Sequence, residues 1–152
     1  RMNVAFDHVI SACAGIARPG QSGTWIVSDM VNAYRQLHRA GMAHSVETWW
    51  DGELAGGLYA VNLGRMVFGE SMFSRRSDAS KIALAALIGF CRHHQIGRID
   101  CQQNTSHLAS LGAREITRQD FVQHLHQAIT MPAPDWRFDS LYWQDVLSSR
   151  WP

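Results

Sequence analysis

The chain has 152 residues, of which 46% are hydrophobic and 18% charged, a composition that fits one globular domain and excludes a disordered or fibrous protein. No apolar stretch approaches the roughly 20 residues that a membrane-spanning helix needs, so no membrane partner is expected. A net charge of +1 argues against a broad basic surface for duplex nucleic acid, so any RNA contact must be local. The three cysteines, an odd number without framework spacing, suit a reducing cytoplasm.

Hydrophobic periodicity predicts the elements in chain order. Residues 5–17 have apolar side chains at helical spacing, and the Pro and Gly of 18–23 end that helix in a loop. Ser28 or Asp29 is expected to cap a second helix. The further expected elements are strands over 45–50, 54–62 and 66–72, a long apolar helix over 82–94 that starts around 77–78, a buried strand over 99–102, a short helix over 107–111, a strand over 113–116, a helix over 117–129 and an irregular tail over 131–152.

This order predicts the fold class. Three consecutive antiparallel strands, followed by alternating helices and strands, give an α/β protein with one mixed sheet and helices on both sides. The Asp51-Gly52 pair is expected to form the first hairpin turn. The fold alone says nothing about the chemistry.

Polar side chains gather on the short strand expected over 99–102. Side chains alternate along a strand, so Asp100 and Gln102 are expected on one face while Cys101 points to the other. This alternation argues against Cys101 as a nucleophile beside them. The pair therefore marks a candidate site.

A second polar position lies on the strand expected over 66–72. By the same alternation, Glu70 is expected to share a face with Met72 and Ser74. A carboxylate in an otherwise apolar run is costly to bury without a partner. For any one such residue a paired structural carboxylate is the alternative, but two such strands together favour a site.

Seven short strings carry a family resemblance: Gly23–Ile26, Ala33–Tyr34, Ala43–Glu47, Gly69–Arg75, Ala79–Lys81, Asp100–Gln102 and Ala109–Ala113. With them, the chain resembles the bacterial leucyl/phenylalanyl-tRNA–protein transferases over about Val4 to Leu125. The resemblance covers the C-terminal catalytic domain of that family, so the chain is expected to be a fragment without the family's N-terminal domain. It implies a Gcn5-related acyltransferase-like fold, with a catalytic domain over 1–130 and a tail over 131–152 packed on it.

The resemblance also implies an activity. Members of the family transfer Leu or Phe from aminoacyl-tRNA to the α-amine of proteins that begin with Arg or Lys, a tag for degradation. By position, Asp100 accepts the proton of the attacking amine or orients it, and Gln102 holds that amine. Glu70 is expected to face the same cleft and bind the cationic acceptor. No cofactor is implied.

The implied pocket for Leu or Phe is apolar, although each of its residues is also plausible as core. Trp25 and Tyr34 match aromatic positions that face the aminoacyl-adenosine. The family places an Asn where this chain has Thr105, so the ester contact falls to Asn104, one residue earlier. The expected pocket residues are Leu58, Val67, Met72, Leu84, Leu87 and Ile99, with Ser74 nearby; Val67 replaces a larger aromatic residue.

Three cations near one helix start are the candidate tRNA site. Arg75, Arg76 and Lys81 surround the start expected at Ser77 and Asp78, where free N–H groups favour phosphate. A solvated loop with capping residues is the alternative.

Two other functions are weaker. An acetyl-CoA-dependent N-acetyltransferase on the same fold needs a glycine-rich turn before the long helix, and residues 74–80 contain no glycine. A binding module without catalysis is disfavoured because the polar site residues are all present. A metal site is not expected, because Cys91 and His94 lack zinc-ligand spacing with a second pair.

Overall fold

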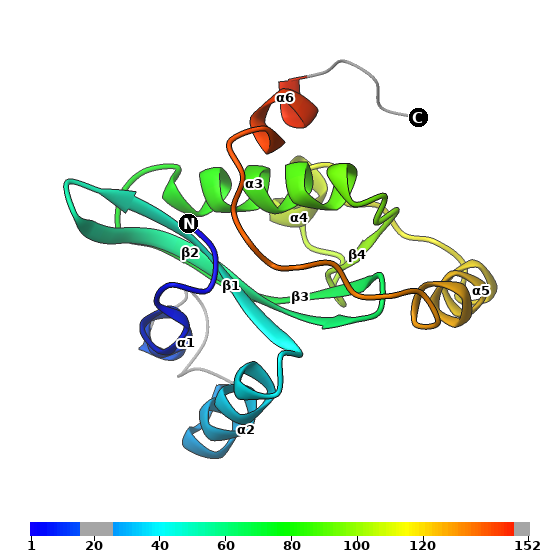
Figure 1. Ribbon diagram of the computed structural model, residues 1–152, viewed down its shortest axis with the longest axis horizontal. Helices are drawn as coiled ribbons and strands as arrows, with labels where there is room; N and C mark the ends of the chain where they lie inside the picture. Colours follow the sequence, from blue (N-terminus) through cyan, green and yellow to red (C-terminus); the bar gives the residue numbers. More distant parts are fainter. Residues whose placement is uncertain (16–25, 148–152) are drawn as a thin grey trace.

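The computed structural model describes residues 1–15 and 26–147, and confirms a mixed α/β architecture (Figure 1). The loop expected over 18–23 and the side chain of Trp25 lie outside the described residues. None of the described helices is long and apolar enough to cross a membrane. The elements are α1 (Phe6–Gly15), α2 (Ser28–Arg39), β1 (Ala43–Trp50), β2 (Glu53–Leu63), β3 (Met66–Ser74), α3 (Ala79–His93), β4 (Ile99–Asp100), α4 (Ser106–Ser110), α5 (Arg118–Ala128) and α6 (Tyr142–Leu147).

The strands form one sheet in the order β1-β2-β3-β4. The first three pair antiparallel through short hairpins, and β4 joins β3 in parallel after the crossover through α3. Asp51 and Gly52 both have positive φ angles, 50° and 80°, as a two-residue hairpin turn of this kind requires. The predicted turn is therefore confirmed.

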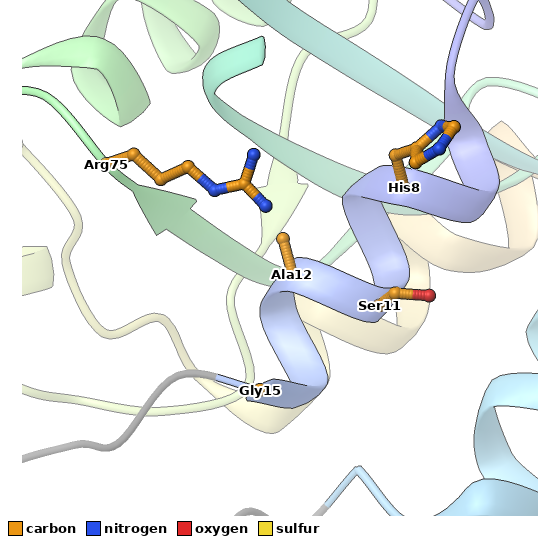
Figure 2. A pocket seen from close by; sticks show the side chains of 5 residues that line it. All are labelled: His8, Ser11, Ala12, Gly15 and Arg75. Atoms are coloured by element: carbon orange, nitrogen blue, oxygen red, sulfur yellow. The ribbon is translucent and has the colours of Figure 1, made fainter.

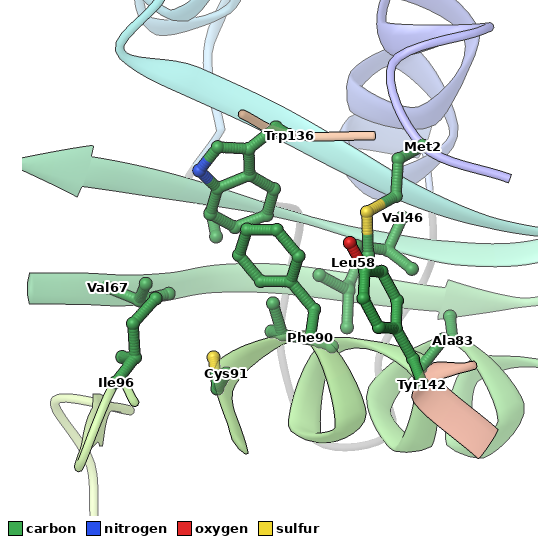
Figure 3. Close-up of a cluster of buried hydrophobic side chains, with 13 residues drawn as sticks. Met2, Val46, Leu58, Val67, Ala83, Phe90, Cys91, Ile96, Trp136 and Tyr142 are labelled. Atoms are coloured by element: carbon green, nitrogen blue, oxygen red, sulfur yellow. The ribbon is translucent and has the colours of Figure 1, made fainter. Parts of the chain in front are cut away.

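The face of the sheet toward α3 holds the larger core (Figure 3). Gly56 of β2 permits the close approach of α3, because a Cβ there would lie 2.6 Å from the Cβ of Ala79. The Thr48 hydroxyl also donates a 2.7 Å hydrogen bond to the carbonyl of Ala79. The first turn of α3 is thus fixed against the sheet. This core comprises Met2, Val46, Leu58, Ala60, Val67, Ala83, Ala86, Leu87, Phe90, Cys91, Ile96, Trp136 and Tyr142.

The opposite face is covered by α1 and α2. Its buried cluster includes Phe6, Val9 and Ile10 of α1 and Tyr59 of β2. Val9 and Ile10 are completely buried, so the helical spacing of apolar residues predicted over 5–17 is confirmed for the part that the structure describes.

A buried carboxylate joins the start of α1 to β1. Glu47 is 3% exposed. Its Oε1 accepts hydrogen bonds from the backbone N–H groups of Val4 and Ala5 and from the Ser45 hydroxyl, and its Oε2 accepts one from Trp49 Nε1. Because the donors are all satisfied by one side chain, α1 begins at a fixed point on the sheet.

The segment after α5 returns to the α3 face. Trp136 is 6% exposed, stacks on His44 at 4.3 Å between ring centroids, and donates from Nε1 to Asn62 Oδ1. Tyr142 is buried against Phe90 and opens the short helix α6. The expectation of a wholly irregular tail is therefore wrong at α6.

Three other local predictions are also wrong. Residues 113–116 form no strand, because all four are exposed and have no apolar face to bury. β4 ends at Asp100 instead of Gln102, which has a φ of 56°, outside the range of a strand. Ser28 is already helical, and Val27 occupies the cap position without a side-chain hydrogen bond.

We expect stability to fall by roughly 2 kcal/mol between pH 7 and pH 5 because of His44. Burial, and to a smaller degree the charge of His38, lowers the pKa of His44 from 6.5 to about 4. His44 therefore takes up a proton near pH 6.5 in the unfolded chain but only near pH 4 in the folded chain. Stability is lost as the pH falls through this window and levels off below it. Urea denaturation at several pH values measures this slope.

The His44→Gln variant should lack this part of the slope, whereas His126→Gln, on the exposed surface of α5, should retain it. Burial also lowers the pKa values of His94 and His124. Their contribution to the pH dependence of stability is therefore the same in both variants. An unchanged slope in His44→Gln would contradict the assignment.

Candidate functional site

β3 contains one residue more than the stretch of β2 beside it. Tyr59 of β2 lies opposite Ser71, and the next residue, Ala60, lies opposite Gly69. Glu70 therefore has no partner residue on β2. Such a β-bulge bends the strand and redirects the extra side chain, and bulges are common next to active sites.

The bulge directs Glu70 toward α2. The Tyr34 hydroxyl of α2 donates a 2.7 Å hydrogen bond to Glu70 Oε2. Burial, and next this hydrogen bond, raises the pKa of the Tyr34 phenol. The prediction that Glu70 shares a face with Met72 and Ser74 is wrong, because the bulge breaks the alternation on which it was based; Met72 packs against the α3 core.

Asp100 lies on the same side of the sheet as Glu70. β4 pairs Ile99 with Val67 and Asp100 with Phe68. Ile99 packs against the α3 core, and alternation then places the Asp100 side chain on the opposite, α2-facing side. Two carboxylates on neighbouring strands thus project from one face. The structure gives no direct contact between them.

Gln102 reaches Asp100 through a turn instead of a strand. Its backbone N–H donates to Asp100 Oδ1 at 2.8 Å, and its Nε2 donates to the Asp100 carbonyl at 3.2 Å. A non-glycine residue with a φ of 56° is strained, and such strain often marks functional positions. The two residues are together as predicted, but the prediction of a shared strand face is wrong. Oδ2 of Asp100 has no hydrogen-bond partner among the described residues.

The six apolar residues predicted for the pocket all belong to one cluster on the α3 side. Leu58, Val67 and Leu87 are 4%, 0% and 1% exposed and serve as core. Met72, Leu84 and Ile99 are only partly buried and pack on its margin. Only these last three therefore have exposed apolar surface that a ligand could contact, and the other three are core.

The polar and apolar groups meet at the free edge of β3. β4 pairs with β3 only at Val67 and Phe68, and beyond Phe68 no strand in the described part of the chain pairs with that edge. Glu70 and Met72, on opposite faces, both flank this unpaired stretch. A substrate that lies along the edge therefore has access to a carboxylate on one side and an apolar surface on the other.

Two of the predicted phosphate-binding cations lie on aromatic rings. The Arg75 guanidinium is 5.5 Å from the Phe73 ring centroid and donates to the Leu54 carbonyl at 3.3 Å. The Arg76 guanidinium is 5.6 Å from the ring centroid of Trp50, which is 56% exposed. Residues of the neighbouring strands thus hold both guanidinium groups, that of Arg75 on the α1 side of the sheet.

The third predicted cation, Lys81, and the hydroxyl of Ser74 both form hydrogen bonds within the turn before α3. Lys81 forms a 2.7 Å ion pair with Asp78, and this hydrogen bond lowers the pKa of the Asp78 carboxyl. Asp78 is the cap residue with a φ of 62°, but its side chain makes no cap hydrogen bond. Ser74 donates to the Arg76 carbonyl and accepts from the Ser80 N–H, so it organises this turn.

Two surface hollows lie beside α1, away from the carboxylates. The first, of about 360 Å³, has Arg75 reaching over the small residues of α1 (Figure 2). The second, of about 400 Å³, lies between α1 and α2. Neither hollow is lined by Glu70 or Asp100. We therefore place the candidate site at the β3 edge, which these two carboxylates border. The first hollow is lined by His8, Ser11, Ala12, Gly15 and Arg75, and the second by Ser11, Ala14, Gly15, Ser28, Val31, Asn32 and Arg35.

The residue predicted to contact the ester, Asn104, and its neighbour Thr105 both have partners within the chain. Asn104 is exposed and donates to Glu115 Oε1 at 2.8 Å. Thr105 caps α4, because its hydroxyl accepts from the Leu108 N–H at 3.1 Å. A Thr directly before a short helical run is a sequence signal from which this cap could have been predicted. No sequence signal indicates the hydrogen bond between Tyr34 and Glu70, which lie far apart in the chain.

Among residues 1–15 and 26–147, no group of three His, Cys, Asp or Glu side chains is arranged to hold a metal ion. The thiol of Cys91 is buried, and burial raises its pKa to about 12. The Cys101 sulfur has a long contact of 3.8 Å to the Ile99 carbonyl, and burial raises its pKa. These directions disfavour a thiolate at neutral pH.

Comparison with known proteins gives one consistent result. A family model described as leucyl/phenylalanyl-tRNA protein transferase matches residues 1–126. A protein of that name from Polaromonas sp. is 64% identical over 152 residues, 100% of this chain and 60% of the relative. Those from Albidiferax ferrireducens and Leptothrix cholodnii are 66% and 58% identical over 148 and 144 residues, 97% and 94% of this chain and 58% and 56% of the relatives. The chain therefore spans a little under two thirds of these relatives.

Proposed function

Because the chain belongs to the leucyl/phenylalanyl-tRNA protein transferase family, we propose that the whole protein transfers Leu or Phe from aminoacyl-tRNA to the α-amine of proteins that begin with Arg or Lys. The observation that supports this most is the free edge of β3, where Glu70 and the Asp100–Gln102 turn lie beside a partly buried apolar surface. Such transfer marks proteins for degradation and takes place in the cytoplasm.

The reaction is aminolysis of an ester. The α-amine attacks the aminoacyl carbonyl carbon, the new C–N bond forms, and the ester C–O bond breaks to release the ribose oxygen of the tRNA. The attacking ammonium must first lose a proton. Asp100 Oδ2 accepts this proton or orients the amine, since Oδ1 is already occupied by the Gln102 N–H.

Gln102 and Glu70 serve the acceptor. The Gln102 side chain is exposed beside Asp100 and helps hold the amine. Glu70 binds the cationic side chain of the first acceptor residue, because it is a partly buried carboxylate on the same face of the sheet. Met72, Leu84 and Ile99 contact the Leu or Phe side chain, and Met suits a pocket that accepts more than one shape.

The architecture of the whole is part of this proposal. Residues 1–130 form an acyltransferase-like catalytic domain of the Gcn5-related type, which the parallel β4 after three antiparallel strands supports. The tail expected over 131–152 packs on this domain in its described part, residues 131–147, since Trp136 and Tyr142 are buried in its core. The acetyl-CoA alternative finds no support, because the turn before α3 contains no glycine and presents the carboxylate of Asp78.

We expect Asp100→Asn in the full-length protein to lower the transfer rate about 100-fold or more, the usual weight of a positioned acid–base group. The Asn side-chain oxygen still accepts from the Gln102 N–H, so the turn survives while the base is removed. The rate is measured with leucyl-tRNA and an Arg-starting peptide. Asp29→Asn, on the exposed first turn of α2, is the matched control. Activity within a few-fold of wild type would remove Asp100 from the mechanism.

Met72→Ala should weaken binding of a puromycin-like aminoacyl nucleoside by roughly 1–3 kcal/mol, the scale of the apolar surface that one such side chain buries. Met66 of the same strand is 1% exposed and provides the control. Met66→Ala should lower the free energy of unfolding by roughly 2–5 kcal/mol and leave affinity per folded molecule unchanged. If Met72→Ala behaves in the same way as Met66→Ala, Met72 is core.

The double variant Arg75→Ala/Arg76→Ala should bind aminoacyl-tRNA more weakly and with a shallower salt dependence, by about one unit of log–log slope for each phosphate that the protein no longer neutralises. The exposed Arg39 and Arg137 give a control of equal charge, Arg39→Ala/Arg137→Ala. Equal slopes in the two double variants would place the phosphate-binding groups elsewhere.

A further inference from the structure

The hydrogen bond between Tyr34 and Glu70 joins residues 36 positions apart on two different elements. It is 2.7 Å long and ends on a carboxylate oxygen, which makes it a strong, charge-assisted bond. It links α2 to β3, and the carboxylate that it holds is the one proposed to bind the acceptor.

Glu70 depends on such a bond more than an ordinary strand residue would. It is the extra residue of the bulge, so no side chain of β2 lies opposite it to limit its rotamers. It is also only partly buried, and packing alone does not fix it. A partner outside the sheet must therefore set the direction of the carboxylate.

Tyr34 is suited to be that partner because its own ring is fixed. The ring packs edge-on against Tyr59, with 5.0 Å between centroids and an interplanar angle of 69°. Tyr59 is completely buried and also packs edge-on against Phe6 of α1. The phenol oxygen is thus held by the cluster between α1, α2 and the sheet.

The bond leaves half of the carboxylate available. Tyr34 occupies Oε2, and Oε1 has no hydrogen-bond partner among the described residues. We propose that Tyr34 is a positioning residue, which holds Glu70 so that Oε1 receives the cationic side chain of the acceptor's first residue. This rests on the proposed function. It differs from the role that the family resemblance implies, in which Tyr34 contacts the aminoacyl-adenosine.

The test is Tyr34→Phe in the full-length protein, which removes the hydroxyl and keeps the ring on Tyr59. The KM for an Arg-starting peptide should rise roughly 10- to 150-fold, the scale of one hydrogen bond to a charged group. The kcat should stay within about twofold, and the Kd of a puromycin-like nucleoside should not change. A role that is merely structural would not separate these three quantities.

Tyr142→Phe is the matched control, because it removes a tyrosine hydroxyl on the opposite face of the sheet, where it donates to the Arg137 carbonyl. It should leave all three quantities unchanged. A Tyr34→Phe variant that weakens nucleoside binding while the peptide KM stays constant would overturn the proposal in favour of a direct donor contact. A variant identical to wild type would also overturn it.

A second measurement does not need turnover. Glu70→Gln should lower the pKa of Tyr34, seen in the ultraviolet absorbance titration of the phenol, because the anionic acceptor is removed. If this pKa does not move, the hydrogen bond is absent and the proposal fails even with an active enzyme. If wild type shows the shift but transfers neither Leu nor Phe to the peptide, the proposed function fails, and the acceptor role of the pair fails with it.

Discussion

The insertion of one residue into β3 sets the geometry of the whole candidate site. Without Glu70, the alternation of β3 would be unbroken from Val67 to Ser74. With it, the strand presents a carboxylate toward α2 and, two residues later, Met72 toward α3. A single strand thereby places a carboxylate on one face of the sheet and an apolar side chain on the other, only two residues apart.

Under the proposed function, this division matters because an aminoacyl ester and a charged acceptor have opposite requirements. The side chain of Leu or Phe is stabilised by apolar surface, whereas the acceptor's amine and cationic side chain require oxygen acceptors. The end of pairing between β3 and β4 leaves the edge between these two surfaces unpaired. In the proposed reaction the scissile bond lies between these two groups, and the edge of β3 borders both in the described part of the chain.

Much of the fold was predictable from the sequence, and the failures share a cause. The first hairpin turn and the apolar faces of α1 and α3 follow from local patterns, and the structure confirms them. The bulge at Glu70 and the turn at Gln102 depend on pairing partners far along the chain, about which alternation within one segment contains no information. Nor could the sequence separate core from pocket surface, because Leu58 and Met72 have equally apolar side chains and differ only in depth. Depth is decided by α3, whose approach depends on the absence of a side chain at Gly56.

Under the proposed function, the charges around the start of α3 favour Arg75 and Arg76 over Lys81 as RNA contacts. Lys81 already forms an ion pair with Asp78. A phosphate that binds Lys81 must displace this carboxylate, so one ion pair is only exchanged for another. Arg76 instead lies 5.6 Å from the Trp50 ring centroid and forms no ion pair with a carboxylate of the described residues, so its guanidinium can pair with phosphate without displacing one. Under the proposed function, an RNA contact of this chain, whose net charge is only +1, depends on such individually placed groups more than on a long-range field.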